Sequence, residues 1–222
     1  MTPLNGRTIN WGELALSPAS DVWGIDRGIP IDRHYIDLFL RAHSDDIRGR
    51  VLEVKDSHYT KTFGSTQVEH AAVIDIDSTN PNATIVADLT RADRLLENQF
   101  DCFVLTQTLH IIYDVRSALQ NALRLLKPTG VLLCTLPAVS RVNYENGGLD
   151  SGDYWRFTQA AVRRLMTEVG NAENVSVTSY GNVRVCTAFL YGFAAHELMP
   201  SDLEFCDPWF PLIHCVRATK PR

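Results

Sequence analysis

The stretch from Phe100 to Pro137 most constrains the fold, because it predicts a strand, a helix and a second strand with short joints. It opens with a short, continuous apolar run, which is typical of a strand buried on both faces. Apolar residues then recur at helical spacing over 115–126, with Asp114 placed as the N-cap. Pro128 and Gly130 are predicted to stop that helix before a second apolar run begins. This order favours a right-handed parallel crossover.

Three more strands are predicted upstream, at 51–54, 71–76 and 83–87. The last two end in acidic residues, Asp75 and Asp88. Each carboxylate alone would be explained as a helix N-cap or a turn residue. Parallel strands place their carboxyl ends at one edge of the sheet, where ligands bind, so the shared position favours a binding edge.

The flanking segments complete the predicted sheet. A helical face from Ile36 through Ile47 precedes the first strand, and Gly49 is predicted to close that helix. Thr158 is placed as the N-cap of a later helix. Strands are expected at 174–180 and 213–219, with an apolar helix at 188–198 between them. The aromatic stretch 203–212 reads as a pocket wall or as a homodimer contact.

The composition is typical of a globular protein: the chain has 222 residues, of which 45% are hydrophobic and 21% are charged. We expect one domain over 1–222, with 1–40 as an N-terminal lid or helical segment. A net charge of -5 gives no basic face for nucleic acid, and no apolar run approaches the ~18 residues of a membrane span. Five cysteines without a CxxC pair predict reduced core residues of a cytoplasmic protein. No close metal-ligand spacing such as HxxxH occurs, so no metal is predicted.

Four motifs resemble class I S-adenosylmethionine (SAM) dependent methyltransferases over about residues 32–170: LEV at 52–54, VADL at 86–89, the 100–137 block and YWRFT at 154–158. The resemblance implies an α/β fold, a doubly wound, mainly parallel, Rossmann-like sheet of seven strands whose last strand is antiparallel. It implies SAM as cofactor and a small-molecule acceptor, with Asp75 at the ribose hydroxyls and Asp88 near the adenine amine. The implied cofactor-binding residues are Glu53, Lys55, Asp56, Tyr59, Asp75, Ile76, Asp88, Leu89, Thr106 and Gln107.

One loop departs from that family. The glycine-rich loop after the first strand reads KDSHYT at 55–60, with no glycine until Gly64. Either the loop follows another path, as in a branch of small-molecule and glycan-associated methyltransferases, or the site no longer binds SAM and the protein is a scaffold. The missing GxGxxG pattern argues against a dinucleotide-binding oxidoreductase. Glu53 lies inside an apolar strand and needs a hydrogen-bonding or cationic partner; the resemblance gives it a role in organising this loop.

His110, just past the fourth predicted strand, is the candidate for catalysis. Methyl transfer from a sulfonium depends mainly on alignment, and a base is needed only when the nucleophile carries a proton of high pKa. A histidine, with an ordinary pKa of about 6.5, could take that proton from a hydroxyl. The alternative is a residue that only packs the loop. The favoured acceptor is a hydroxyl of a sugar or secondary metabolite, and an amine is the alternative.

Two segments are candidates for acceptor binding. The first carries Arg33, His34 and Tyr35 ahead of the first strand, and arginine is the best carboxylate partner on geometric grounds. In the competing interpretation Tyr35 packs in the core and Arg33 is solvated. The second carries Tyr154, Trp155 and Arg156, where Trp155 either walls the acceptor pocket or anchors the helix after it. The loop 138–152 is predicted to be a mobile flap near the acceptor.

Overall fold

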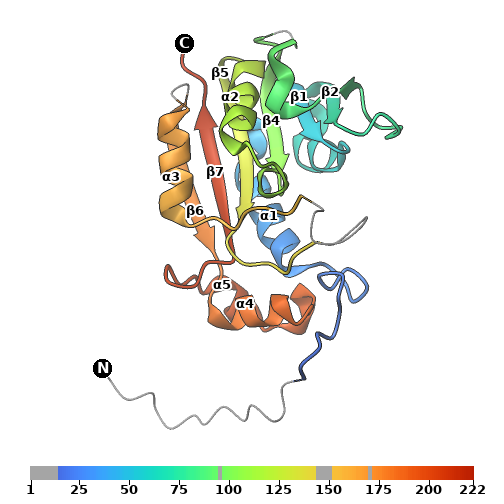
Figure 1. Cartoon of the computed structure of the whole chain (residues 1–222), viewed down its shortest axis with the longest axis vertical. Helices are drawn as coiled ribbons and strands as arrows, with labels where there is room; N and C mark the ends of the chain where they lie inside the picture. Colours follow the sequence, from blue (N-terminus) through green and yellow to red (C-terminus); the bar gives the residue numbers. More distant parts are fainter. Residues whose placement is uncertain (1–14, 95–96, 144–151, 170–171) are drawn as a thin grey trace.

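The computed structural model describes residues 15–94, 97–143, 152–169 and 172–222. Over these residues one sheet of seven strands forms the centre of the molecule, in the order β3-β2-β1-β4-β5-β7-β6 (Figure 1). Pairing is parallel from β3 to β5, and β7 runs antiparallel to both of its neighbours, β5 and β6. The predicted fold class is therefore confirmed. The strands are β1 (Gly49–Val54), β2 (Val68–Asp75), β3 (Ile85–Val86), β4 (Phe100–Thr106), β5 (Leu126–Pro137), β6 (Glu173–Tyr180) and β7 (Ile213–Thr219).

Helices cover both faces of this sheet. Alternate residues of β4 enter opposite hydrophobic cores, Phe103 and Leu105 on one side and Cys102 and Val104 on the other. The first core is closed by α2 (Val115–Leu125) and α3 (Gln159–Glu168). The second is closed by α1 (Ile31–Ala42) and α4 (Val183–Leu190), and the short α5 (Pro200–Glu204) follows α4. Burial on both faces explains why the central strands read as continuous apolar runs.

Both predicted N-caps are confirmed. A carboxylate oxygen of Asp114 accepts a hydrogen bond from the Ser117 amide at 3.0 Å at the start of α2. The Thr158 hydroxyl accepts from the Ala161 amide at 3.2 Å at the start of α3. Each cap satisfies one of the amides that a first helical turn leaves without a partner.

The prediction that Gly49 closes the helix before β1 is wrong. Helix α1 ends at Ala42, a 3-10 turn follows at Ser44–Asp46, and Gly49 is the first residue of β1. Glycine is required there for a different reason: its φ is +64°, and a Cβ would lie 2.5 Å from a carboxylate oxygen of Asp101.

Other boundaries also differ from prediction. Helix α2 ends at Leu125, so Pro128 and Gly130 lie in β5 and do not stop the helix. The third strand is only two residues long. The apolar helix expected at 188–198 is wrong in position, because Asn182 caps α4 five residues earlier. A 3-10 turn follows at Ala195–Glu197.

The N-terminal segment is described from residue 15, so residues 1–14 of the lid predicted at 1–40 lie outside the described residues. Ala19 and Ser20 donate backbone hydrogen bonds to the carbonyl of Tyr191 near the end of α4. Trp23 contacts the loop after β5: its Nε1 donates to the Ser140 hydroxyl at 3.1 Å, and the Arg141 guanidinium lies 3.7 Å from its ring centroid. Of the predicted flap at 138–152, residues 144–151 lie outside the described part.

All five cysteines are free thiols. Four are buried, as predicted, but Cys206 is exposed, so the core assignment is wrong for that residue. In the described part of the chain, no helix combines the length and the apolar character needed to cross a membrane.

Candidate functional site

The direction of the strand order reverses between β1 and β4. From β1 the chain proceeds outward to β2 and β3, whereas from β4 it proceeds the other way, to β5. At such a switch point the loops after the two strands diverge, and ligands of open α/β sheets bind between them. The sequence-predicted cofactor residues lie near the carboxyl ends of β1 to β4 and on the segments that follow these strands.

Glu53 fixes the loop after β1. Its side chain is buried, and its two carboxylate oxygens accept hydrogen bonds from the amides of Tyr59 at 3.0 Å and Thr60 at 2.7 Å. Burial raises the pKa of this carboxyl, while the hydrogen bonds with Thr60 and Tyr59 act in the opposite direction. The hydrogen-bonding partners predicted for Glu53 are thus backbone amides of the loop after β1, and these bonds hold the loop in place.

Lys55 does what a glycine does in a glycine-rich loop. Its φ is +73°, a left-handed conformation that L residues rarely adopt, and its amide donates to the carbonyl of Ile74 at 3.1 Å. Asp56 then turns the chain by accepting from the amide of His58 at 2.8 Å. Tyr59 stacks on Phe63, with ring centroids 6.2 Å apart, and burial raises the pKa of its hydroxyl to about 12. The loop therefore has an ordered path without glycine.

Asp75 lies at the carboxyl end of β2 beside a hollow of ≈ 360 Å³. One carboxylate oxygen accepts from the amide of Asp77 at 3.0 Å, and the other accepts from the side-chain amide of Asn80 at 2.6 Å. The same Asn80 nitrogen donates to the carbonyl of Lys55 at 2.7 Å. Asn80 therefore joins the ends of β1 and β2 across the hollow, which is lined by Lys55, Asp56, Asp75, Asp77, Thr79, Asn80, Pro81 and Asn82.

Asp88 is held in a turn. Its carboxylate accepts from both the amide and the hydroxyl of Thr90 at 2.8 Å, at the start of the 3-10 segment Leu89–Arg94. This is the turn geometry that was the alternative reading of the residue. Leu89 packs in the core below, whereas Ile76, the residue after Asp75, has 70% of its surface exposed. An apolar side chain so exposed beside a polar hollow can contact the flat face of a ligand.

The chain turns sharply after β4. Gln107 has a φ of +44°, and its amide donates to the carbonyl of Thr135 at 3.1 Å. Thr106 ends β4, and its carbonyl accepts from the hydroxyl of Thr108 at 2.9 Å. The turn reaches α1, because the side-chain amide of Gln107 lies 3.5 Å from a carboxylate oxygen of Asp32.

His110 lies in the 3-10 turn Leu109–Ile111 that follows. Its Nδ1 is buried and has no hydrogen-bond partner in the described structure. Burial lowers the pKa of the imidazole to about 4, Arg156 and Arg33 lower it further, and Asp153 opposes them. His110 is therefore neutral near pH 7 and can accept a proton from a group that reaches it.

The structure separates the three candidates on α1. Tyr35 is completely buried, its hydroxyl donates to the carbonyl of Leu203 at 2.9 Å, and its ring stacks on Tyr180. It takes the core position, as in the competing interpretation. Arg33 is partly exposed in the first turn of α1, and its charge acts on both His110 and Tyr59. His34 contacts Tyr35 edge to face, with ring centroids 5.4 Å apart.

Arg156 joins the two described ends of the segment between β5 and α3, residues 138–143 and 152–158. Its guanidinium pairs with both carboxylate oxygens of Asp153 and donates to the carbonyls of Ser140 and Arg141. Trp155 is anchored through its Nε1, which donates to the carbonyl of Ile112 at 3.0 Å. Tyr154 is half exposed. The three candidates therefore differ: Arg156 is engaged with its own loop, while the two rings lie at the surface.

Sequence reasoning missed two residues of this region, Asn80 and Tyr113. Asn80 lies in the segment DSTNPN, where clustered turn residues after an acidic strand end were the available signal. Tyr113 precedes the cap Asp114 and is 70% exposed, in contact with the rings of Tyr154 and Trp155. Only the fold brings these segments together, so spacing in the sequence could not have revealed the contact.

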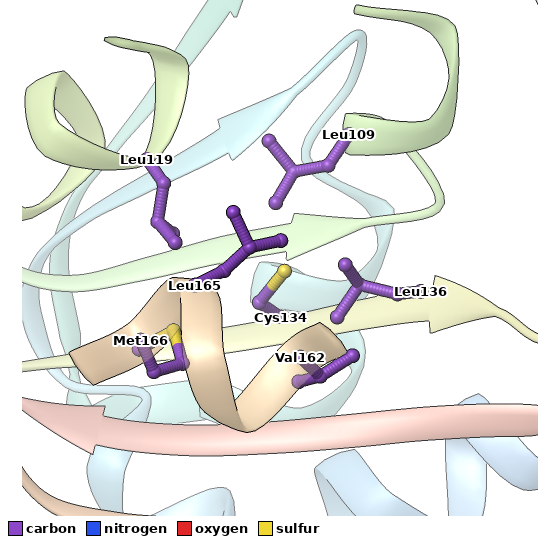
Figure 2. A pocket seen from close by; sticks show the side chains of 7 residues that line it. All are labelled: Leu109, Leu119, Cys134, Leu136, Val162, Leu165 and Met166. Atoms are coloured by element: carbon purple, nitrogen blue, oxygen red, sulfur yellow. The ribbon is translucent and has the colours of Figure 1, made fainter. Parts of the chain in front are cut away.

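A second hollow lies inside the protein, under the turn that carries His110 (Figure 2). Its volume is ≈ 10 Å³, about the space of one water molecule. Its walls come from the turn, α2, β5 and α3, and are formed by Leu109, Leu119, Cys134, Leu136, Val162, Leu165 and Met166. It is a packing defect and too small for a ligand. Among the described residues no group of three or more His, Cys, Asp or Glu side chains is arranged to hold a metal ion.

Comparison with known proteins finds methyltransferases both by sequence model and by fold. Residues 43–134 match a family model described as "Methyltransferase domain". A SAM-dependent methyltransferase from Archaeoglobus fulgidus shares 11% identity and a TM-score of 0.56, covering 85% of this chain and 94% of its own. The N-methyltransferase NodS from Bradyrhizobium japonicum, solved with S-adenosyl-L-homocysteine, shares 16% identity and a TM-score of 0.57, covering 92% and 94%. No curated protein matches the sequence. At these identities the likeness to solved structures establishes the fold.

Proposed function

We propose that the chain is a class I SAM-dependent methyltransferase, because residues 43–134 match a methyltransferase family model and the fold is shared with such enzymes. The proposed acceptor is a hydroxyl of a small molecule, either a sugar or a secondary metabolite. The cofactor supplies an electrophilic methyl group on a sulfonium sulfur. The chain must bind the cofactor, align the acceptor with it and accept the proton that the hydroxyl loses.

The observation that carries this proposal is the position of Asp75 beside the hollow at the end of β2. A carboxylate can accept two hydrogen bonds from the vicinal hydroxyls of a ribose. The neighbouring loop after β1 is ordered by Glu53, and Lys55 supplies the left-handed backbone that glycine provides elsewhere. Exposed Ile76 offers an apolar face next to Asp75. The residues present therefore fit an adenosine, which argues against a degenerate site.

His110 is proposed as the proton acceptor. With a pKa of about 4, it is too weak a base to deprotonate a free alcohol. A weak base suffices when the proton moves late, because the hydroxyl becomes strongly acidic as its oxygen bonds to the methyl carbon. Arg33, whose charge acts on His110, is proposed to contact the carboxylate of the cofactor or the acceptor.

Calorimetry with SAM and S-adenosylhomocysteine tests the cofactor site. Asp75→Ala should weaken binding by about tenfold to a hundredfold, because hydrogen bonds to a charged group are lost. Glu69→Ala is the matched control, since Glu69 is an exposed carboxylate at the opposite end of the same strand. Unchanged affinity in Asp75→Ala would show that the ribose contact is misplaced. If neither compound binds the wild-type protein, the scaffold interpretation becomes the leading one.

An amine acceptor is the second candidate, favoured by the likeness to NodS, an N-methyltransferase. A neutral amine attacks without a base, so the two candidates differ at His110. For a hydroxyl acceptor, His110→Ala should lower turnover and leave SAM affinity nearly unchanged. Unchanged turnover would remove His110 from the mechanism and favour the amine.

The setting of the reaction is part of the proposal. The acidic composition supports a small acceptor and no nucleic-acid partner. Five free thiols fit the cytoplasm. The exposed rings of Phe205, Trp209 and Phe210 support a homodimer contact, which sedimentation analysis would test.

A further inference from the structure

Three aromatic rings form an open surface beside His110. Tyr113 comes from the end of the turn after β4, and Tyr154 and Trp155 come from the loop before α3. We propose that these rings, called here the aromatic platform, stack against the ring of a sugar, so that the methyl acceptor is a carbohydrate. This inference rests on the proposed methyl transfer and narrows its substrate.

The platform is fixed to the turn that carries His110. The amides of Tyr154 and Trp155 donate to the His110 carbonyl at 2.9 Å and 3.1 Å. The Trp155 indole donates to the carbonyl of Ile112 at 3.0 Å. The platform and the residue proposed to take the proton are therefore attached to the same turn.

The rings support one another. Tyr113 stacks on Trp155, with centroids 5.7 Å apart and planes inclined by 30°, and it meets Tyr154 edge to face at 5.3 Å. Arg156 fixes the loop behind them by pairing with Asp153 and with the carbonyls of Ser140 and Arg141. The platform is thus ordered before any ligand arrives, which reduces the entropy lost on binding.

The degree of exposure of the rings supports a sugar as the ligand. Tyr113, Tyr154 and Trp155 are 70%, 52% and 38% exposed. A sugar ring suits an open aromatic surface, because its C–H face covers the rings while its hydroxyls remain in water. A flat apolar acceptor would instead need a site that encloses most of its surface. The apolar hollow under the same turn, at ≈ 10 Å³, cannot provide one.

Aromatic faces can also attract ammonium groups, so a cationic ligand is the comparison that the test must include.

Saturation-transfer NMR on the purified protein tests the platform. The probes are methyl glycosides of common hexoses, 6-deoxyhexoses and N-acetylhexosamines, with catechol and benzyltrimethylammonium as comparison ligands. Each is titrated with and without S-adenosylhomocysteine. We expect at least one glycoside to bind, with the strongest transfer to the C–H protons of one ring face, and weaker binding of both comparison ligands.

Variants assign the signal to the platform. The double variant Tyr113→Ala, Tyr154→Ala should weaken glycoside binding by at least about tenfold. The control Tyr113→Phe, Tyr154→Phe keeps both rings and should bind within about threefold of the wild type. Trp155 is left intact because its indole hydrogen bond holds the turn. Circular dichroism and the affinity for S-adenosylhomocysteine confirm that each variant is folded.

Three results would overturn the inference: no glycoside binds, glycoside binding is the same in the alanine variant, or catechol or the ammonium binds more tightly. These results are distinct from failure of the proposed function, which calorimetry with S-adenosylhomocysteine measures separately. The glycoside titrations without S-adenosylhomocysteine test the aromatic platform even if the cofactor does not bind.

Discussion

The side-chain amide of Asn80 donates to one carboxylate oxygen of Asp75, the residue proposed to bind the ribose, and to the carbonyl of Lys55. A ribose hydroxyl that approaches this oxygen therefore competes with Asn80. We predict that Asn80→Ala tightens SAM binding by about threefold to tenfold, since a competing hydrogen bond is removed. Calorimetry measures this change. Asn82→Ala, from the same hollow, should have little effect. Weaker binding in Asn80→Ala would mean that Asn80 orients the carboxylate for the ribose.

His110 makes stability depend on pH. Burial lowers the pKa of His110 from its ordinary 6.5 to about 4 in the folded protein. Protonation below pH 6.5 thus favours the unfolded chain, so the stabilisation is full above that pH and is lost as pH falls toward 4. Between pH 7.5 and 4.5 this residue should account for about 2 to 3 kcal/mol of the lost free energy of unfolding. Urea unfolding of the wild type and His110→Gln at both pH values measures it, and equal pH dependence in the two proteins would contradict the prediction.

At the residue scale, sequence predicted some site contacts and missed others. A carboxylate inside an apolar strand had to find a partner, and Glu53 found one in the loop after β1. That Lys55 adopts a left-handed conformation could not be predicted, because the surrounding fold imposes it against the residue's own preference. The Asn80 and Tyr113 contacts depend on segments that only the tertiary fold brings together.

Among the elements, one guanidinium joins the two described ends of the segment between β5 and α3, residues 138–143 and 152–158. Arg156→Lys keeps the charge but cannot form the paired hydrogen bonds to Asp153 and the carbonyls of Ser140 and Arg141. We predict a loss of about 1 to 3 kcal/mol in the free energy of unfolding, with faster hydrogen exchange at the Asn143 amide, which bonds to Asp153. Arg163→Lys, on the exposed face of α3, is the control. Unchanged exchange at Asn143 would show that the loop is held by other contacts.

Element types were predictable where periodicity and caps agreed, as for α2 and α3 with Asp114 and Thr158. Boundaries were not predictable where a residue has two structural uses. Gly49 resembles a helix terminator but serves a close approach to Asp101. Pro128 resembles a helix stop but is accommodated at the start of β5, where the pairing with β4 is irregular between Phe100 and Cys102.

For the whole molecule, the reactivity of each thiol depends on whether the fold buries it. Burial raises the pKa of the Cys186 thiol to about 11 and also raises the pKa of the Cys102, Cys134 and Cys215 thiols, whereas Cys206 is exposed. We predict that one thiol per chain reacts quickly with Ellman's reagent at pH 8 and that the rest react only in denaturant. Cys206→Ser should abolish the fast phase. A fast phase that survives this change would show that one of the buried elements opens readily.

The position of β7 determines when the molecule can assemble. It is the last strand in chain order, yet it lies inside the sheet between β5 and β6 and is hydrogen-bonded to both. A ribosome exposes β5 and β6 well before it exposes β7, so these two strands must wait without their partner. The growing chain therefore carries two unpaired strand edges during synthesis, when chaperones would have most reason to bind it.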